Sequence, residues 1–302
     1  MIPQSSIAKR GRRCWGWFAF ILVMMIGGPA WWWHRSSAAT LVDPPMPTGI
    51  EDAEVQQAIK SARQHVLDNA HSADAWGCLG MTLLAQLFDR EADRCFAEAS
   101  HLDPGDPRWP YGRGRIALKR DPDHALPLLR LAVSAAANSS PRDLSAFRLP
   151  LAEALLERGE WQEAEQLFRD DWQQNPDNPR TAFGLGLIAV EHDEPRAAVD
   201  FLTIAQASPF AHKTATAQLA TLARRHGDRA TAERYEKEIA TLSSDPAWPD
   251  PFLDRVMQLR VGQRRLEREV EELERQQRYA EAAKIWLEQL QQRRTSQACL
   301  GA

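Results

Sequence analysis

The sequence predicts an all-α fold built from repeated pairs of antiparallel helices. Three observations lead to this prediction. Alanine is abundant and runs of β-branched residues are few, which favours helices over strands. A pattern of large apolar and small residues recurs at one spacing over most of the chain. Turns rich in proline, glycine, asparagine and aspartate separate consecutive copies, as at 103–107 and 175–179.

The N-terminus is predicted to cross a membrane. Residues 14–33 contain no charged side chain, and a helix of about 20 residues spans the roughly 30 Å of a bilayer core. Tryptophans lie at both ends of this stretch, as in an interfacial aromatic belt: Trp15, Trp17, Trp31, Trp32 and Trp33. Basic residues precede it within 1–13: Lys9, Arg10, Arg12 and Arg13. The positive-inside rule therefore predicts a cytoplasmic N-terminus and an extracytoplasmic, periplasmic remainder.

A cleaved signal peptide is the alternative to this anchor. A basic segment followed by an apolar segment suits either, and Gly28-Pro29-Ala30 resembles a cleavage site. Three tryptophans directly after that site favour the uncleaved anchor. Residues 34–48 then form a linker rich in proline and serine. A capping box from Thr48 to Glu51 predicts a helix over 51–69, which packs as an N-terminal half repeat.

The clearest copy of the repeat begins at Ala73. Its signature residues are Trp76, Leu79, Gly80, Leu83, Ala92, Phe96, Ala99 and Pro104. Gly80 and Ala92 are small where two helices approach closely, and the larger residues fill the space on either side. The run resembles the tetratricopeptide repeat (TPR), a helix pair of about 34 residues. This resemblance implies an α-solenoid of stacked hairpins over 49–242 that serves as a protein-interaction module.

Weaker copies follow the same spacing. The copy that starts at Ser145 carries Ala164, Phe168 and Pro176, and the copy that starts at Pro179 carries Gly186 and Ala198. Degenerate copies cover 107–140, 213–246 and 263–296. Ser140 supplies a capping hydroxyl before Pro141. Because such repeats bury their apolar faces only against neighbours, these copies together are expected to build one continuous core.

The segment 243–251 breaks the array because its three prolines exclude a helix. After this break, the C-terminal region 252–302 is predicted to begin with one long helix over 252–277. The helix is rich in arginine and glutamate, and Leu259, Leu266, Val270 and Leu273 lie on one face. We expect it to be a polar cap that closes the solenoid. A dimerising coiled coil is the alternative, and its heptad pattern is short.

The sequence contains no motif for catalysis, metal binding or phosphate binding. The eight histidines are scattered, and Gly112-x-Gly114 follows no strand. Cys78 and Cys95 could form a disulfide, but two free thiols are favoured because these positions normally point to different sides. A net charge of −4 indicates no nucleic-acid partner. We therefore expect neither an enzyme, nor a cofactor, nor a small-molecule substrate.

The TPR resemblance also implies a binding groove on the concave face. First-helix positions that point away from the second helix of their repeat would line it: Met81, Leu84, Arg108, Tyr111, Arg115, Leu149, Glu153, Leu156, Arg180, Phe183, Leu187 and Arg224. The lysine–asparagine clamp of chaperone-binding relatives is absent, whereas arginines lie beside aromatic and aliphatic residues. Arginine side chains suit carboxylates, and the exposed Tyr111 and Phe183 would supply apolar anchors. We therefore expect the groove to bind an extended or helical acidic–hydrophobic peptide of a partner protein. The alternative is that the arginines are solvated and Phe183 packs against the next repeat.

The sequence as a whole predicts a membrane-anchored scaffold or adaptor that displays TPR repeats on the extracytoplasmic side. By analogy it resembles an envelope assembly or biogenesis factor. Two alternatives stay open at this point. The first is a self-associating scaffold that uses the helix at 252–277. The second is a non-catalytic regulatory subunit of an enzyme complex.

Overall fold

The computed structural model describes residues 43–288, and every regular element in this part of the chain is helical. The chain divides into two units between Asp43 and Pro44, and the unit that begins at Pro44 is described below. The predicted anchor at 14–33, the basic segment before it and most of the linker lie outside the described residues. Within 43–288, no helix combines the length and apolarity needed to cross a bilayer.

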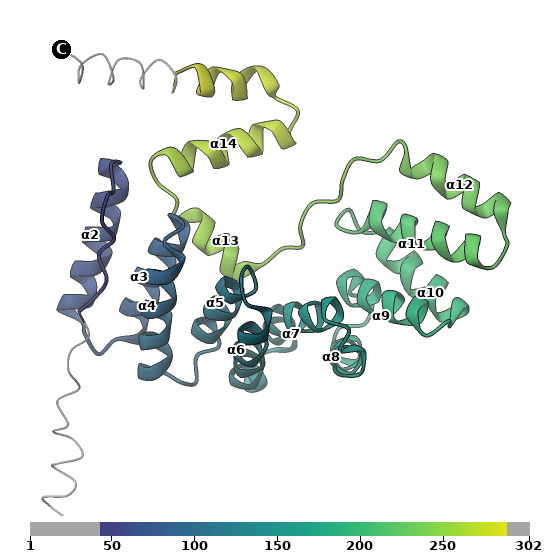
Figure 1. Ribbon diagram of the computed structural model, residues 1–302, viewed down its shortest axis with the longest axis horizontal. Helices are drawn as coiled ribbons and strands as arrows, with labels where there is room; N and C mark the ends of the chain where they lie inside the picture. Colours follow the sequence, from purple (N-terminus) through teal and green to yellow (C-terminus); the bar gives the residue numbers. More distant parts are fainter. Residues whose placement is uncertain (1–42, 289–302) are drawn as a thin grey trace, which may run out of the picture. The chain divides into compact units, whose positions relative to one another are not determined.

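Five antiparallel hairpins follow one another in the described part of the chain (Figure 1). They are α3 (Ala73–Ala85) with α4 (Asp89–Leu102), α5 (Arg108–Ala117) with α6 (Pro122–Ala135), α7 (Pro141–Glu157) with α8 (Trp161–Gln174), α9 (Pro179–Glu191) with α10 (Pro195–Gln206), and α11 (His212–Arg225) with α12 (Arg229–Ile239). Each helix contacts the next one in the chain. The five copies recognised between 73 and 246 are therefore confirmed as helix pairs.

The small residues of the signature lie where helices touch. A Cβ added to Gly80 would lie 2.6 Å from Cε1 of Phe96, on the second helix of the same hairpin. In the fourth hairpin, a Cβ on Gly186 would lie 2.8 Å from Cδ2 of Leu202. Ala92 is fully buried. The helices can pack this closely only because these side chains are small, as the sequence predicted.

The helix that precedes the hairpins begins later than predicted. Helix α2 (Ala53–Asp68) is capped by Asp52, whose carboxylate accepts hydrogen bonds from the backbone N–H groups of Glu54 and Val55 at 2.9 and 3.3 Å. The capping role predicted for Thr48 is therefore wrong. The half-repeat packing is confirmed, since α2 contacts α3 and buries Val55, Ile59 and Val66.

A buried carboxylate fixes the junction between the third and fourth hairpins. Asp171 of α8 is fully buried and accepts hydrogen bonds from the hydroxyl groups of Ser145 and Thr181, which lie on α7 and α9. The guanidinium of Arg148 lies 3.7 Å from the same carboxylate. A buried charge is tolerated only when it is paired and hydrogen-bonded in this way. The cluster thus sets how α7 and α9 lie beside each other.

The single helix predicted over 252–277 is wrong. The chain instead forms α13 (Pro251–Gln258) and α14 (Gln263–Arg275), because Gly262 between them adopts a φ of 57°, which ends a helical path. Nor does α13 cap the end of the array, because it contacts α3. The break also removes the continuous stripe on which a coiled coil would depend.

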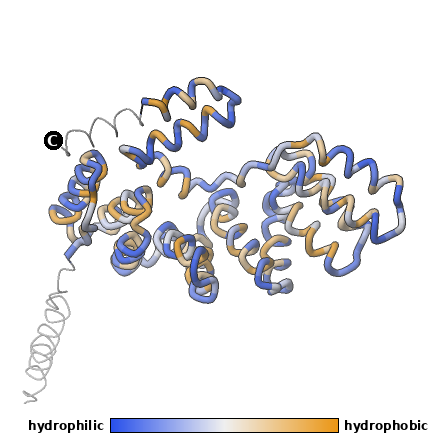
Figure 2. The backbone as a smooth tube through the Cα atoms, turned by 45° about the horizontal axis from the view of Figure 1, so that its top comes forward, coloured by the Kyte–Doolittle hydropathy of each residue, from blue (hydrophilic) through white to orange (hydrophobic). Residues whose placement is uncertain are grey.

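The last repeat copy forms the expected helix pair. A helix begins at 279 directly after α14, and Val270 and Ala282 are buried. Hydrophilic and hydrophobic stretches alternate along the helices, as amphipathic helices require (Figure 2). Tyr279, Trp286 and Leu287 of this terminal pair are exposed.

Candidate protein-binding groove

The predicted groove is not an open surface along its whole length. Met81, Leu84, Tyr111 and Leu149 are at most 6% exposed. They belong to the same buried cluster as Phe252 and Val256 of α13. The expectation that Tyr111 is exposed is therefore wrong, because a later part of the same chain packs against this face. We call that part, residues 245–262, the return segment.

The return segment begins at α11. The two carboxylate oxygens of Asp245 accept hydrogen bonds from the backbone N–H groups of Lys213 and Thr214, each at 2.8 Å. Burial raises the pKa of Asp245, but these hydrogen bonds lower it more, so the net shift is downward. Trp248 follows, with its ring 5.5 Å from that of Phe210. The first contacts of the segment are thus made with the fifth hairpin and the loop before it.

The segment then reaches α9, where it meets a predicted groove residue. Arg180 Nη1 lies 3.5 Å from the carbonyl oxygen of Pro249, and its guanidinium lies 6.0 Å from the centre of the Trp248 ring. Arg180 also forms two hydrogen bonds of 2.6 Å to Glu153 of α7. Burial lowers the pKa of Arg180, but Glu153 more than offsets this effect, so the guanidinium stays charged. Two of the predicted groove residues therefore pair with each other beneath the segment.

Asp250 makes the central polar contact. Its carboxylate accepts a hydrogen bond of 2.6 Å from the Tyr111 hydroxyl and lies 3.7 Å from Nε of Arg115. The other carboxylate oxygen caps α13 by accepting hydrogen bonds from the N–H groups of Phe252 and Leu253. Burial and the nearby Asp250 charge raise the pKa of Tyr111, which keeps its hydroxyl protonated as a donor.

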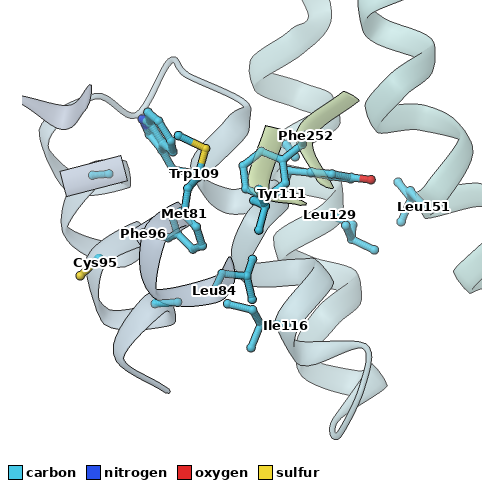
Figure 3. Close-up of a cluster of buried hydrophobic side chains, with 14 of the residues drawn as sticks. Met81, Leu84, Cys95, Phe96, Trp109, Tyr111, Ile116, Leu129, Leu151 and Phe252 are labelled. Atoms are coloured by element: carbon cyan, nitrogen blue, oxygen red, sulfur yellow. The ribbon is translucent and has the colours of Figure 1, made fainter. Parts of the chain in front are cut away.

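Phe252 inserts between α3–α4 and α5. Its ring lies 5.8 Å from that of Phe96 and 5.6 Å from that of Tyr111, both in edge-on arrangements (Figure 3). A Cβ on Gly112 would lie 2.7 Å from Cζ of Phe252, so glycine at this position makes room for the ring. Both glycines of Gly112-x-Gly114 therefore allow close packing, because the Leu129 side chain occupies the space that a side chain on Gly114 would need.

The segment ends at the other extreme of the array. Gln86 at the end of α3 donates a hydrogen bond of 3.2 Å to the carbonyl oxygen of Leu259. Gly262 N–H donates to Glu54 of α2 at 3.1 Å, and the next N–H donates to Asp52 at 3.2 Å. From Asp245 to Gly262, the segment thus contacts α11, α9, α5, α3 and α2, in the reverse of their order in the chain.

The remaining predicted groove residues have other partners. Arg108 pairs with Asp106 at 2.5 Å and with Asp74 at 2.7 Å. Arg224 is exposed and pairs with Glu236. Leu156, Phe183 and Leu187 are half-buried, and Phe183 packs against the hydrophobic cluster of the fourth and fifth hairpins. Tyr111, Arg115 and Arg180 therefore all contact the return segment, whereas Arg108 and Arg224 pair with other residues.

Sequence reasoning missed the return segment itself. Residues 248–252 read Trp-Pro-Asp-Pro-Phe, an acidic–hydrophobic stretch of the chemistry predicted for the ligand. Pro249 favours an extended chain up to Asp250, and Pro251 stands in the first turn of α13, where a helix tolerates proline. The signal was therefore present, but the stretch was interpreted only as a break between elements.

Cys78 and Cys95 do not form a disulfide with each other. Cys78 is half-buried, Cys95 is buried, and both are free thiols, so the favoured alternative is confirmed. Burial raises the pKa of the Cys95 thiol, which makes it unreactive. Among residues 43–288, no cluster of three or more histidine, cysteine, aspartate or glutamate side chains could hold a metal ion.

Comparison with solved structures supports the TPR-like fold. The chain is similar to YrrB, described as "a TPR protein with an unusual peptide-binding site", with 15% identity, a TM-score of 0.50, and coverage of 60% of this chain and 91% of that chain. It is also similar to PilF of Pseudomonas aeruginosa, with 18% identity, a TM-score of 0.52, and coverage of 62% and 83%. No protein-family model matches the chain, and no curated protein matches its sequence. At these identities the likeness concerns the fold alone.

Proposed function

We propose that this protein is a membrane-anchored scaffold whose concave groove binds a segment of another protein. The observation that carries this proposal is the return segment. A stretch of polypeptide lies in the groove and is held by Tyr111, Arg115 and Arg180, three of the residues predicted from repeat position alone. These contacts suit an acidic–hydrophobic chain that is extended up to its carboxylate and helical after it, as the return segment is around Asp250.

Anchoring and location are part of the same proposal. The apolar stretch at 14–33, its flanking tryptophans and the preceding basic residues support an uncleaved helix with the repeats on the extracytoplasmic side. A tethered, non-catalytic scaffold of this kind fits an envelope assembly or biogenesis factor. The groove offers charged and aromatic contacts for a peptide, and we assign it no catalytic step.

Site-specific photo-crosslinking in cells tests the binding face. A photoreactive amino acid at Leu187 lies on α9, at a half-buried groove position, whereas one at Leu131 lies exposed on α6, a second helix. We expect an adduct with a second protein from the Leu187 position and none from the Leu131 position. Equal adducts from both positions would show that the groove is not the binding face.

Topology is tested separately. We expect the full chain to stay in the membrane after alkaline carbonate extraction and to begin at its encoded N-terminus when the membrane fraction is sequenced. Protease added to the extracytoplasmic side should digest the repeats. A mature chain that starts near Trp31 or Thr40 would contradict the anchor.

A further inference from the structure

We infer that the return segment is an internal ligand that the partner displaces, and that the partner docks through a segment of the same chemistry. This inference rests on the proposed function and specifies its partner. The partner would present a carboxylate at the end of an extended, proline-containing stretch and an aromatic ring two residues later, in the first turn of a helix, as Asp250 and Phe252 do at the start of α13. It would run from α9 towards α3, as residues 248–259 do.

The first reason is that the groove recognises two side chains of the return segment that are a fixed two residues apart. The carboxylate of Asp250 meets a hydroxyl donor and a cation, Tyr111 and Arg115. Two residues later, the ring of Phe252 fills the space that Gly112 leaves. Neither site is satisfied by an arbitrary peptide: the first requires an acceptor, and the second requires a flat ring. The lining therefore selects an acidic–aromatic pair.

The second reason is that the extended part of the return segment can leave without unfolding any hairpin. No regular secondary structure is present from 242 to 250, between the end of the fifth hairpin and α13. The hairpins keep their own stacking contacts, each helix with the next. The docked state is also imperfect: Oε1 of Gln86 and Nε of Arg260 are buried without a hydrogen-bond partner in the described part of the chain.

The third reason is the short tether. Because the return segment is joined to α12 through only a few residues, its effective concentration at the groove is high, on the order of millimolar for a short flexible linker. A weak or sequence-unrelated peptide therefore cannot compete. A partner that carries the acidic–aromatic pair, and is itself concentrated at the membrane, can do so. The internal ligand thus sets a threshold for binding.

Displacement of the return segment would also affect the contacts next to α2. The return segment ends with the hydrogen bond from the Gly262 N–H to Glu54, and the N–H of Gln263, the first residue of α14, donates to Asp52. The α14 helix pair follows directly. When a partner replaces residues 248–259, the α14 pair would lose the hydrogen bond of 3.0 Å that Arg268 donates to the carbonyl oxygen of Met257. Occupation of the groove would therefore be signalled to the C-terminal helix pair.

A competition experiment tests the inference. The probe is a fluorescent synthetic peptide with the sequence of residues 245–260, and its anisotropy is measured against the purified full-length protein. Asp250→Arg places a cation against Arg115 and should undock the return segment. Asp254→Arg is the matched control, because Asp254 is exposed. Phe252→Ala is a second undocking variant that leaves the charges unchanged.

We expect both undocking variants to bind the peptide at least about 10-fold more tightly than the wild type and Asp254→Arg do. A peptide with alanine in place of Phe252 should not bind. In the undocked variants, hydrogen exchange should be faster in 245–262 and unchanged in α4 and α8, which shows that the hairpins stay folded.

Equal affinity for the wild type and both undocking variants would overturn the inference. So would concentration-dependent dimers of the wild type that the peptide dissociates, because the occupant would then be a second copy of the chain. If no variant binds the peptide but crosslinking from Leu187 still captures a partner, the inference fails and the proposed function stands. If both experiments fail, the proposed function fails as well.

Discussion

The two halves of the groove use equivalent repeat positions but differ in what covers them. Around α3 and α5, helix α13 seats Phe252 against aromatic rings, and Met81 and Tyr111 are as buried as a protein core. Around α9 and α11, only the extended residues of the return segment pass by, and Leu187 and Arg224 stay half-buried or exposed. A groove position is therefore a core position or a surface position according to its occupant.

This difference explains how the return segment can dock tightly and still be displaced by a partner. Burial of apolar side chains in the first half supplies most of the docking energy, since each buried aromatic ring contributes more than an exposed polar contact. The second half adds direction and charge through Asp245, Trp248 and Arg180. A competing segment that enters at the second half meets the weaker contacts first.

The largest effect should come from Phe252→Ala. Removing a buried phenyl ring costs about 3–5 kcal/mol, and here the loss falls on docking of the return segment. We expect a lower melting temperature and faster hydrogen exchange in 245–262, α3 and α5. If Trp248→Ala destabilises the protein as much, the proposed difference between the two halves is wrong.

Within the hairpins, Gly80→Leu and Ala92→Leu should each destabilise by about 1–3 kcal/mol, because overpacking forces side chains and backbone to shift. Phe96 is the group that the leucine at position 80 would displace, since it lies 2.6 Å from a Cβ on Gly80. Trp76→Phe, a smaller change in volume, serves as the comparison and should cost less. Thermal melts of all three variants decide the order, and leucine variants that melt like the wild type would contradict this packing.

Trp248→Ala tests the second half of the groove. Its ring contacts Phe210 and the Arg180 guanidinium but is half-buried, so we expect a loss of about 1–2 kcal/mol. Exchange should increase near 245–250, while α3 and α5 stay protected. Loss of protection at α5 would show that the two halves are released together.

The smallest effect is a dependence on pH. Because the pKa of Asp245 is lowered in the folded protein, its contribution to stability is present above its unfolded pKa of about 4 and is lost as the pH falls through the lower, folded value. Asp245→Asn should therefore reduce the loss of stability below about pH 4. Melting curves of the wild type and this variant at pH 3 to 7 measure the difference, and parallel curves would contradict the assignment.

The sequence predicted the hairpins because their determinants are local. Gly80, Ala92 and Phe96 lie within one repeat, and the turns at 103–107 and 175–179 mark its ends. Position within the repeat also selected Tyr111, Arg115 and Arg180, which the return segment contacts. It could not tell that Arg108 would pair with Asp106, because that choice depends on side-chain conformation.

The occupant of the groove was beyond such reasoning for a physical reason. Tyr111 and Asp250 meet across 139 positions in sequence, and no local spacing encodes that pairing. The turn that ends α13 depends on one glycine in a stretch rich in arginine and glutamate, so 252–277 reads as continuous helix. The starting point of α2 was misjudged because Asp52 competes successfully with Thr48 as a cap.

The contacts of the return segment change how the array of hairpins folds and unfolds. A simple solenoid has only neighbour contacts, so its repeats can form and melt one after another. Here the last-made part of the segment is hydrogen-bonded to α2, the first helix within 43–288, which adds long-range contacts and slows completion of the fold. Until residue 262 has been synthesised and released, the face around Tyr111 has no internal occupant. A newly made chain would therefore pass through a period in which its groove is open to any suitable segment.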